Sequence, residues 1–207
     1  MTPFTTKVDE LFSEWNSPDS PGCAVAIIQR GQIIHSCGYG MADLEHAIPI
    51  STNSVFDIGS ISKQCTAMSV ALLARQKKLS LDDEIQKHLP EIRRYKYPIT
   101  IRHLIHHVSG LRDYITLMEL AGLPFENEYP DDEIISLIAR QNELNFRPRD
   151  EHLYSNSGYF LLGEIVKRVS GMSLRAFADE NIFTPLAMNS THFHDDWFLS
   201  KKQGPRT

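Results

Sequence analysis

Cysteine is scarce in this sequence, which has three among its 207 residues. An odd number of cysteines without regular spacing argues against a disulfide framework and fits a reducing compartment. Positive charge is also in deficit, because the formal net charge at pH 7 is -5. The aromatic residues do not cluster with Lys and Arg as a base-stacking surface requires, so we expect no nucleic-acid partner.

Long apolar runs are missing as well. No stretch approaches the roughly 18 apolar residues that a membrane-spanning helix needs, so we expect no membrane span. The N-terminal segment has neither the apolar core nor the small-residue cleavage site of a signal peptide, and the chain as written is expected to be cytoplasmic. Its 42% hydrophobic and 23% charged residues are ordinary for a globular protein with one core or two small domains.

The first 50 residues predict a helix followed by a β-hairpin. Apolar residues recur at helical spacing over 5–15. Two runs rich in β-branched residues follow over 22–40, and Arg30-Gly31 at their junction favours a tight turn. A two-stranded hairpin alone is marginal in water. Either the helices cover it alone, or the remaining strands of its sheet lie outside these 207 residues.

Beyond Ser51 the apolar pattern is mostly helical. Helices are predicted over 62–76, from Asp82 onward, and within 99–111, 130–142, 157–171 and 173–183. The fold class that follows is α/β (α+β). Residues 1–50 are expected to form the N-terminal part of a sheet domain, and residues 51–207 a mainly helical domain.

Ser60 and Lys63 form the first candidate for chemistry, at the start of the helix predicted over 62–76. Residues three apart lie on one face of a helix. A serine hydroxyl is a poor nucleophile until a base takes its proton, and a desolvated amine can help to do so. The other interpretation is a serine cap with a solvated lysine. Lys63 lies beside apolar positions rather than on an obviously polar face, which weakens that interpretation.

Tyr154 and Asn156 form the second candidate, within 152–163. Residues two apart point to the same side of an extended segment. A tyrosine near cationic groups can act as a phenolate base, and an asparagine can orient a lysine or a substrate amide. The alternative is a turn before a helix, with Ser155 or Asn156 as its cap.

Two further groups are weaker candidates. His103, His106 and His107 have spacings that metal sites also use, but no acidic or cysteine ligand accompanies them. Structural or surface histidines explain them better, so we expect no metal and no cofactor. Cys65 lies inside a predicted helix without an obvious catalytic partner, and it is interpreted as a structural cysteine.

The order and spacing of four segments resemble the serine β-lactamase and D,D-peptidase superfamily. The similarity is greatest to the class C β-lactamase-like serine hydrolases, which include D-aminopeptidases and related esterases. The segments are FDIGSISKQCTA, LIHHVSGLRDY, YSNSGYFLLGEIVKRVSGMSL and IFTPLAMNSTHF. The first carries the S-x-x-K signature of β-lactamases and penicillin-binding proteins. The fold that this implies is β-lactamase/transpeptidase-like, with a partial antiparallel sheet.

The resemblance implies roles for single residues. Ser60 corresponds to the acylated nucleophile and Lys63 to its helical partner. Tyr154 corresponds to the general base and leaving-group acid, and Asn156 to the residue that contacts the lysine and the substrate amide. The implied activity is that of a serine hydrolase, whose acyl-enzyme forms on an amide, β-lactam, D-amino-acid peptide or ester.

The sequence also departs from the family pattern. Arg149 and Ala187 stand where the family usually has the glycines of Pro-Gly and Pro-Leu-Gly-Met. A third motif, Lys or His followed by any residue and Gly on a strand, is matched late in the chain only by 202–204. That segment lacks a strand-like pattern and is rejected. We therefore expect the N-terminal part of a longer hydrolase. The alternative is a non-catalytic truncated homologue that binds a peptide or a partner chain.

Overall fold

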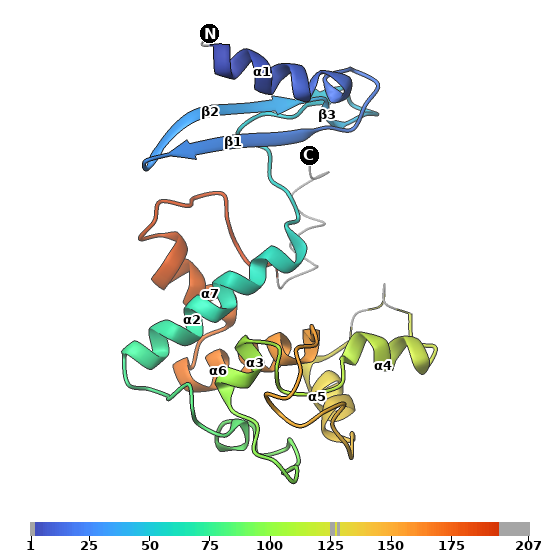
Figure 1. The fold of residues 1–207 in the computed structure, drawn as a ribbon, viewed down its shortest axis with the longest axis vertical. Coiled ribbons are helices and arrows are strands. Elements are labelled where there is room, and N and C mark those ends of the chain that lie inside the picture. The colour runs from blue at the N-terminus through green and yellow to red at the C-terminus, as the bar shows by residue number, and fades with distance from the viewer. Residues whose placement is uncertain (1–2, 125–126, 128, 195–207) are drawn as a thin grey trace. The chain divides into compact units, whose positions relative to one another are not determined.

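The computed structural model describes residues 3–124, 127 and 129–194, and the chain forms two compact units (Figure 1). The first unit reaches Asp57 and the second begins at Ile58. The first contains the β-strands and one helix, and the second is mainly helical. This organisation is the mixture of α and β structure that the residue pattern predicts. The domain limits placed at 50 and 51 stay a prediction.

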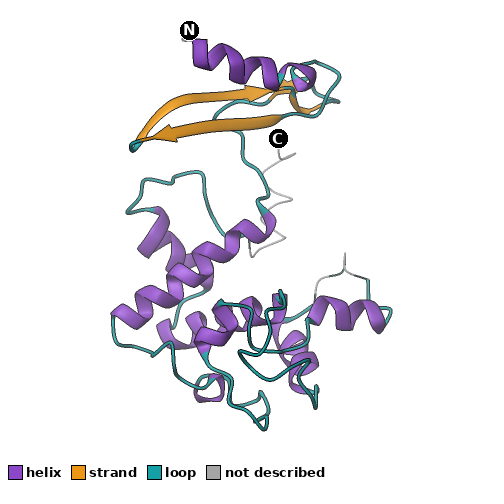
Figure 2. Ribbon diagram, viewed as in Figure 1, coloured by secondary structure: helices purple, strands orange, loops and turns teal. Residues whose placement is uncertain are grey.

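The first unit is built on the predicted hairpin. Strands β1 (Cys23–Gln29) and β2 (Gln32–Tyr39) pair antiparallel, with Cys23 opposite Tyr39 and a register shift between Ile27 and Ile28. Helix α1 (Pro3–Leu11) and the 3-10 turn η1 (Ser13–Trp15) precede them, and Figure 2 shows α1 running along the hairpin. The helix predicted over 5–15 is therefore interrupted at Phe12.

Tyr39 connects the hairpin to the N-terminal helix. Its side chain is buried, its hydroxyl donates to the Asp9 carboxylate at 2.7 Å, and its ring stacks on Phe12 with 5.1 Å between the ring centres. His35 lies 3.0 Å from the same hydroxyl. Stacked aromatic rings and a satisfied buried hydroxyl both stabilise such a contact.

A second small sheet completes the first unit. Strands β3 (Met41–Asp43) and β4 (Ile48–Pro49) pair antiparallel, and the sequence pattern did not indicate them. The first unit leaves the apolar side chains of Ile28, Ile33 and Ile34 exposed.

The second unit packs its helices around α2 (Lys63–Arg75) and α6 (Asn156–Ser170). The other helical segments are α3 (Ile101–Ile105), α4 (Tyr114–Leu120), α5 (Asp131–Ala139), α7 (Leu174–Ala178) and the π-helical turn η4 (Asp179–Phe183). Val70 and Leu73 of α2 and Leu161, Leu162 and Ile165 of α6 are fully buried. Burying one such side chain stabilises a fold by about 1.5–3 kcal/mol.

The prediction of a helix that begins at Asp82 is wrong. The chain forms only the 3-10 turn η3 (Ile85–Lys87) there. The Asp83 carboxylate accepts the Ser80 N–H, and the Ile85 N–H donates to the carbonyl of Ile99. The Asp83 carbonyl, which a helix from Asp82 would bond to the Lys87 N–H, instead accepts the N–H of Ile101 at 3.1 Å. Tertiary partners therefore override the local helical pattern.

None of the helices in the described ranges is long and apolar enough to cross a membrane.

Candidate active site

Ser60 lies in a one-turn 3-10 helix, η2 (Gly59–Ser62), that runs directly into α2. Gly59 adopts φ 50°, in the left-handed region that glycine tolerates. Lys63 is the first residue of α2 and is half-buried, whereas Ser60 is exposed. The hydroxyl is therefore reachable from solvent, at the amino end of a helix with one buried face.

The four residues predicted from two distant motifs meet in space. Lys63 Nζ donates to Ser60 Oγ at 3.0 Å, and the Tyr154 hydroxyl donates to the same oxygen at 2.5 Å. Lys63 Nζ also donates to Asn156 Oδ1 at 3.0 Å. A hydroxyl, an amine and a phenol thus converge within hydrogen-bond reach, which is the geometry that proton transfer to or from a serine requires.

The surroundings of Tyr154 favour its phenolate. Burial raises the pKa of the Tyr154 phenol, but hydrogen bonding with Lys63 and Ser60 and the Lys63 charge outweigh that effect. The resulting pKa lies below the ordinary value of 10.0. Lys63 Nζ lies 4.8 Å from the centre of the tyrosine ring. A phenol that ionises more easily is a better general base near neutral pH.

Asp113 holds Asn156 in place, and the sequence pattern did not single it out. Its carboxylate accepts the backbone N–H of Asn156 and, at 3.4 Å, the side-chain amide nitrogen. It also caps α4 by accepting the N–H groups of Ile115 and Thr116. Because Asn156 donates to Asp113, its amide oxygen is turned toward Lys63. An Asp before a short apolar run is an N-cap signal, but local spacing does not reveal the contact with α6.

Ser157 fastens the same loop to the start of α6. Its hydroxyl donates to the Arg112 carbonyl at 2.7 Å and accepts the Tyr114 N–H at 2.8 Å. The side chain is fully buried. Asp113 and Ser157 together fix the amino end of α6, from which Asn156 projects.

The three histidines do not lie on one helical face. Helix α3 ends at Ile105, and His107 has φ 56° beyond it. His103 Nδ1 accepts the N–H of Thr100 in a capping box. His107 instead packs its ring on Tyr154, at 4.6 Å between ring centres. The interpretation of the three as structural or surface histidines fits His103. It missed the contact of His107 with Tyr154.

Across the described part of the chain, no group of three His, Cys, Asp or Glu side chains is arranged to hold a metal ion. Cys65 is half-buried against a small cluster of Ala178, Ile182 and Phe183. Burial raises the pKa of its thiol, which makes it a weaker nucleophile.

Two departures from the family pattern fall on strained backbone. Arg149 has φ 78° and Ala187 has φ 54°, the left-handed region that favours glycine. Both positions therefore keep the backbone conformation for which the usual glycine is suited. The segment 202–204, considered for a third motif, lies outside the described residues.

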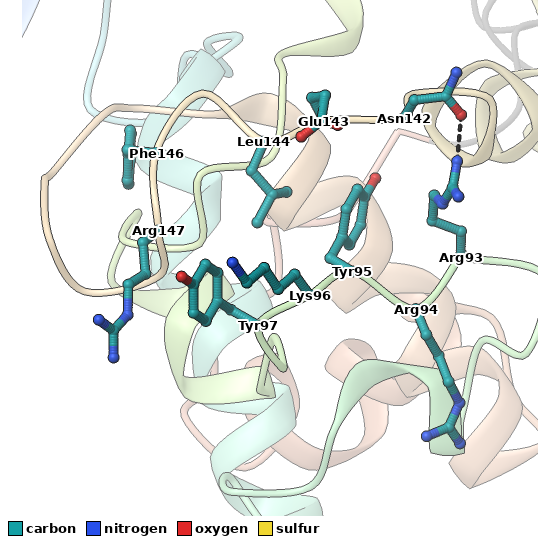
Figure 3. A pocket seen from close by; sticks show the side chains of 10 residues that line it. All are labelled: Arg93, Arg94, Tyr95, Lys96, Tyr97, Asn142, Glu143, Leu144, Phe146 and Arg147. Atoms are coloured by element: carbon teal, nitrogen blue, oxygen red, sulfur yellow. Dashed lines mark hydrogen bonds between the residues drawn. The ribbon is translucent and has the colours of Figure 1, made fainter.

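A basic concavity of about 430 Å³ shares no residue with this site (Figure 3). Its cationic side chains have partners within the protein. Arg93 donates to Asn142, and Arg94 lies 3.7 Å from the Glu84 carboxylate. Lys96 and Arg147 both lie against the ring of Tyr97, at 5.5 and 4.8 Å from its centre. Figure 3 shows Arg93 and Arg94 pointing to opposite sides, so their charges do not converge on one point.

The sequence is similar to those of known proteins. The sequence matches the family model described as Beta-lactamase over residues 8–198. Penicillin-binding protein 4* of Bacillus subtilis (strain 168) is 32% identical over 173 residues, covering 83% of this chain and 38% of that protein. The D-aminopeptidase of Gluconobacter oxydans (strain 621H) is 31% identical over 168 residues, covering 81% of this chain and 31% of that enzyme.

Solved structures show the same fold. The crystal structure of FmtA from Staphylococcus aureus aligns with a TM-score of 0.78 at 26% identity, over 95% of this chain and 52% of FmtA. The predicted β-lactamase/transpeptidase-like fold class is thereby confirmed. The chain spans between 31% and 52% of the length of these three relatives. By the match over most of its residues, the chain belongs to the beta-lactamase family, within the serine β-lactamase and transpeptidase superfamily.

Proposed function

We propose that Ser60 is the nucleophile of a serine hydrolase that works through an acyl-enzyme. The observation that carries this proposal is the meeting of Lys63 Nζ and the Tyr154 hydroxyl at Ser60 Oγ, at 3.0 and 2.5 Å. Lys63, Tyr154 and Asn156 serve as its partners. The membership of the family and the serine hydrolase chemistry of its S-x-x-K motif support these roles.

In the acylation step, the Tyr154 phenolate takes the proton of the Ser60 hydroxyl while Oγ bonds to the substrate carbonyl carbon. The Lys63 ammonium, at hydrogen-bond distance from Ser60 Oγ, stabilises negative charge on the reacting oxygens. The Ser60 backbone N–H, in the first turn of η2, serves as one donor to the oxyanion. Tyr154 then returns the proton to the leaving amine or alkoxide as the carbonyl bond to it breaks.

Deacylation reverses these roles. Water loses a proton to the Tyr154 phenolate as it attacks the acyl carbon, and Ser60 leaves with a proton returned by the phenol. Asn156 keeps the lysine directed at the serine through its amide oxygen, 3.0 Å from Nζ. The resemblance also predicts that this amide group contacts a substrate amide.

The substrate that we propose is a small molecule or peptide with an acyl bond: an amide, a β-lactam, a D-amino-acid peptide or an ester. Relatives named as a penicillin-binding protein and a D-aminopeptidase support the amide and lactam members of this set. The absence of a nucleic-acid partner and a cytoplasmic location, both inferred from the sequence, stay predictions.

A second candidate is a homologue that binds a peptide or partner chain without turning it over. The observation behind it is that the described residues of the second unit contain no β-strand that could carry the third motif. In this family the strand with the third motif is expected to supply the second oxyanion donor, and loss of one such donor typically costs about 10²–10³ in rate.

A panel of three substrates whose hydrolysis is followed by absorbance separates the two candidates. A penicillin, a D-alanine p-nitroanilide and a p-nitrophenyl ester are each incubated with the wild-type chain and with Ser60→Ala. The hydrolase proposal expects product from at least one substrate and its loss in the variant. Product formation that survives Ser60→Ala contradicts it. A folded chain that is inert toward all three, yet binds a D-alanyl peptide in calorimetry, supports the second candidate.

A further inference from the structure

We infer that His107, as the neutral tautomer with its proton on Nε2, is a positioning residue that holds the Tyr154 phenol against Ser60. The inference rests on the proposed function, because it assigns Tyr154 the role of base. Among the described residues, the sequence neighbours of Tyr154 and the Tyr154 ring contact His107, and Ser60 does not. His107 acts through the tyrosine.

His107 accepts two hydrogen bonds, from the residues on either side of Tyr154 in the chain. The backbone carbonyl of His107 accepts the N–H of Leu153 at 2.9 Å, and its ring Nδ1 accepts the N–H of Ser155 at 3.1 Å. One residue therefore fixes the backbone immediately before and immediately after the tyrosine. The segment between the two bonds is left with little freedom to move the phenol away from Ser60.

The Ser155 bond also determines the protonation state of the ring. A backbone N–H can only donate, so the Nδ1 that faces it has to carry a lone pair. A neutral imidazole with Nδ1 as acceptor carries its proton on Nε2. Protonation of Nδ1 would place two donors against each other and break this bond.

The ring of His107 also packs against the ring of Tyr154. Its centre lies 4.6 Å from that of the Tyr154 ring and 5.1 Å from that of the Tyr159 ring, with tilts of 30° and 35°. The Tyr159 hydroxyl donates to the carbonyl of Ile105 at 3.0 Å, which anchors that ring. Tyr154 itself is 45% exposed, so the contact with His107 is one of the few that can restrain its ring.

The backbone of His107 is strained in a way that serves these contacts. Its φ of 56° is in the left-handed region, which residues other than glycine rarely adopt. Such a conformation persists only where the surroundings over-determine it, and it is common at functional sites. With this φ, the carbonyl and the ring of His107 both accept hydrogen bonds from the segment that contains Tyr154.

Charged and titratable groups face His107 from several elements. They are Lys63 of α2, His106 beside it in sequence, His152 in the segment before Tyr154, and the phenols of Tyr154 and Tyr159. Burial lowers the pKa of His107, and the nearby cationic groups lower it further. The surroundings therefore agree with the neutral ring that the Ser155 bond requires.

The first test needs no catalytic activity. The ¹⁵N spectrum of the labelled chain at neutral pH should show His107 with a proton on Nε2 and none on Nδ1. Ultraviolet titration of the Tyr154 phenolate, isolated by subtracting the spectrum of Tyr154→Phe, should move to higher pH in His107→Phe. That variant keeps a ring but lacks the acceptor, so the phenol would drift from Lys63 and Ser60.

The second test compares two replacements in the acylation of Ser60. His107→Asn keeps an acceptor near the Nδ1 position and tolerates the left-handed backbone, so it should acylate within about threefold of wild type. His107→Phe should be slower by up to about 10²-fold, the loss that a misplacement of about 1 Å can cause. His106→Asn, at the neighbouring exposed histidine, is the matched control and should leave the rate unchanged.

The outcomes of the two tests are separable. A Ser60 that is never acylated in the wild-type chain overturns the proposed function, while the ¹⁵N spectrum and the phenol titration still decide the inference. An imidazolium or an Nδ1–H tautomer at neutral pH overturns the inference. So does an unchanged Tyr154 titration in a folded His107→Phe. If that variant does not fold, a shifted Tyr154 titration in the folded His107→Asn counts against the inference, because the retained acceptor should hold the phenol.

Discussion

The Tyr154 hydroxyl donates to Ser60 Oγ at 2.5 Å, although the two residues are 94 positions apart in the chain. Ser60 is in the turn η2 that precedes α2, and Tyr154 is two residues before α6. These two helices form the centre of the second unit, with fully buried residues on both. The core that holds the helices together therefore also sets the distance between the proposed nucleophile and its base.

Removing the phenolic hydroxyl should slow acylation without unfolding the protein. Tyr154→Phe deletes the group proposed to take the serine proton, and a positioned general base typically contributes about 10²–10⁴-fold in rate. Single-turnover acylation measured by mass spectrometry gives the rate. Tyr97→Phe, in the basic concavity away from the site, is the control and should acylate as wild type. Equal rates for the two variants would argue against a role for Tyr154 as base.

Asp113 should stabilise the protein through both α4 and α6. Asp113→Ala removes the cap of α4 and leaves the backbone N–H and the side-chain amide of Asn156 without this acceptor. The free energy of unfolding should therefore fall by about 1–3 kcal/mol. Asp113→Asn keeps one oxygen for the cap and should lose less. Urea denaturation measures both variants. Asp132→Ala, in the exposed first turn of α5, should cost less than 1 kcal/mol.

Glycine at the two strained positions should stabilise the fold. In Arg149→Gly and Ala187→Gly the left-handed backbone is relieved, and after the extra entropy of the unfolded chain each should gain about 0.5–1 kcal/mol. Gly171→Ala at φ 75° is the reverse control: it has open space for a Cβ but should lose about 1 kcal/mol through backbone strain alone. Thermal or urea unfolding checks the signs. Destabilisation by both glycines would show that the side chains of Arg149 and Ala187 contribute more than their strain.

Acid should weaken the fold through two half-buried histidines. Burial, the largest cause at both, lowers the pKa of His103 and His107 below the ordinary 6.5. The unfolded chain then binds more protons than the folded chain between the folded values and 6.5. The contribution of the two histidines to the free energy of unfolding is therefore fully present above about pH 6.5, and it is lost as the pH falls through this window. Urea denaturation at about pH 7.5 and about pH 5.5 measures the loss, while most carboxylates stay ionised.

A second loss of stability should appear at lower pH. Burial raises the pKa of Asp83, but hydrogen bonds from Lys87, Ser80 and His88 outweigh it and lower the value to about 2. Stability supplied by this carboxylate is present above its ordinary pKa of 3.8 and is lost as the pH falls toward 2. In Asp83→Asn the free energy of unfolding should depend less on pH in that range. If its dependence on pH is the same as in the wild type, the stability lost in acid comes from other groups.

The sequence predicts those features that short-range spacing encodes. Arg30-Gly31 between β-branched runs specifies the hairpin, and Ser60 with Lys63 specifies one face of a helical turn. Tyr154 and Asn156 were found because they stand two residues apart before a helix. Their meeting with Ser60 was implied by family resemblance, since no local rule brings α2 to α6.

Other features depend on tertiary contacts that a local pattern does not contain. Asp113 reaches Asn156 only because the loop before α4 lies against the start of α6. His107 was grouped with its neighbours as a helical histidine, but the chain leaves the helix before it and turns its ring toward Tyr154. The helix expected from Asp82 does not form for the same reason, because the Asp83 carbonyl accepts the N–H of Ile101 instead of a helical N–H four residues on.

The central claim is that Ser60 is a nucleophile activated by Lys63 and Tyr154. The most direct measurement is peptide mapping by mass spectrometry after reaction of the chain with a fluorophosphonate. The account predicts a single adduct on Ser60, absent from Ser60→Ala and formed far more slowly in Lys63→Ala and Tyr154→Phe. An adduct on another residue, or labelling of Ser60 at an undiminished rate in both partner variants, would contradict it.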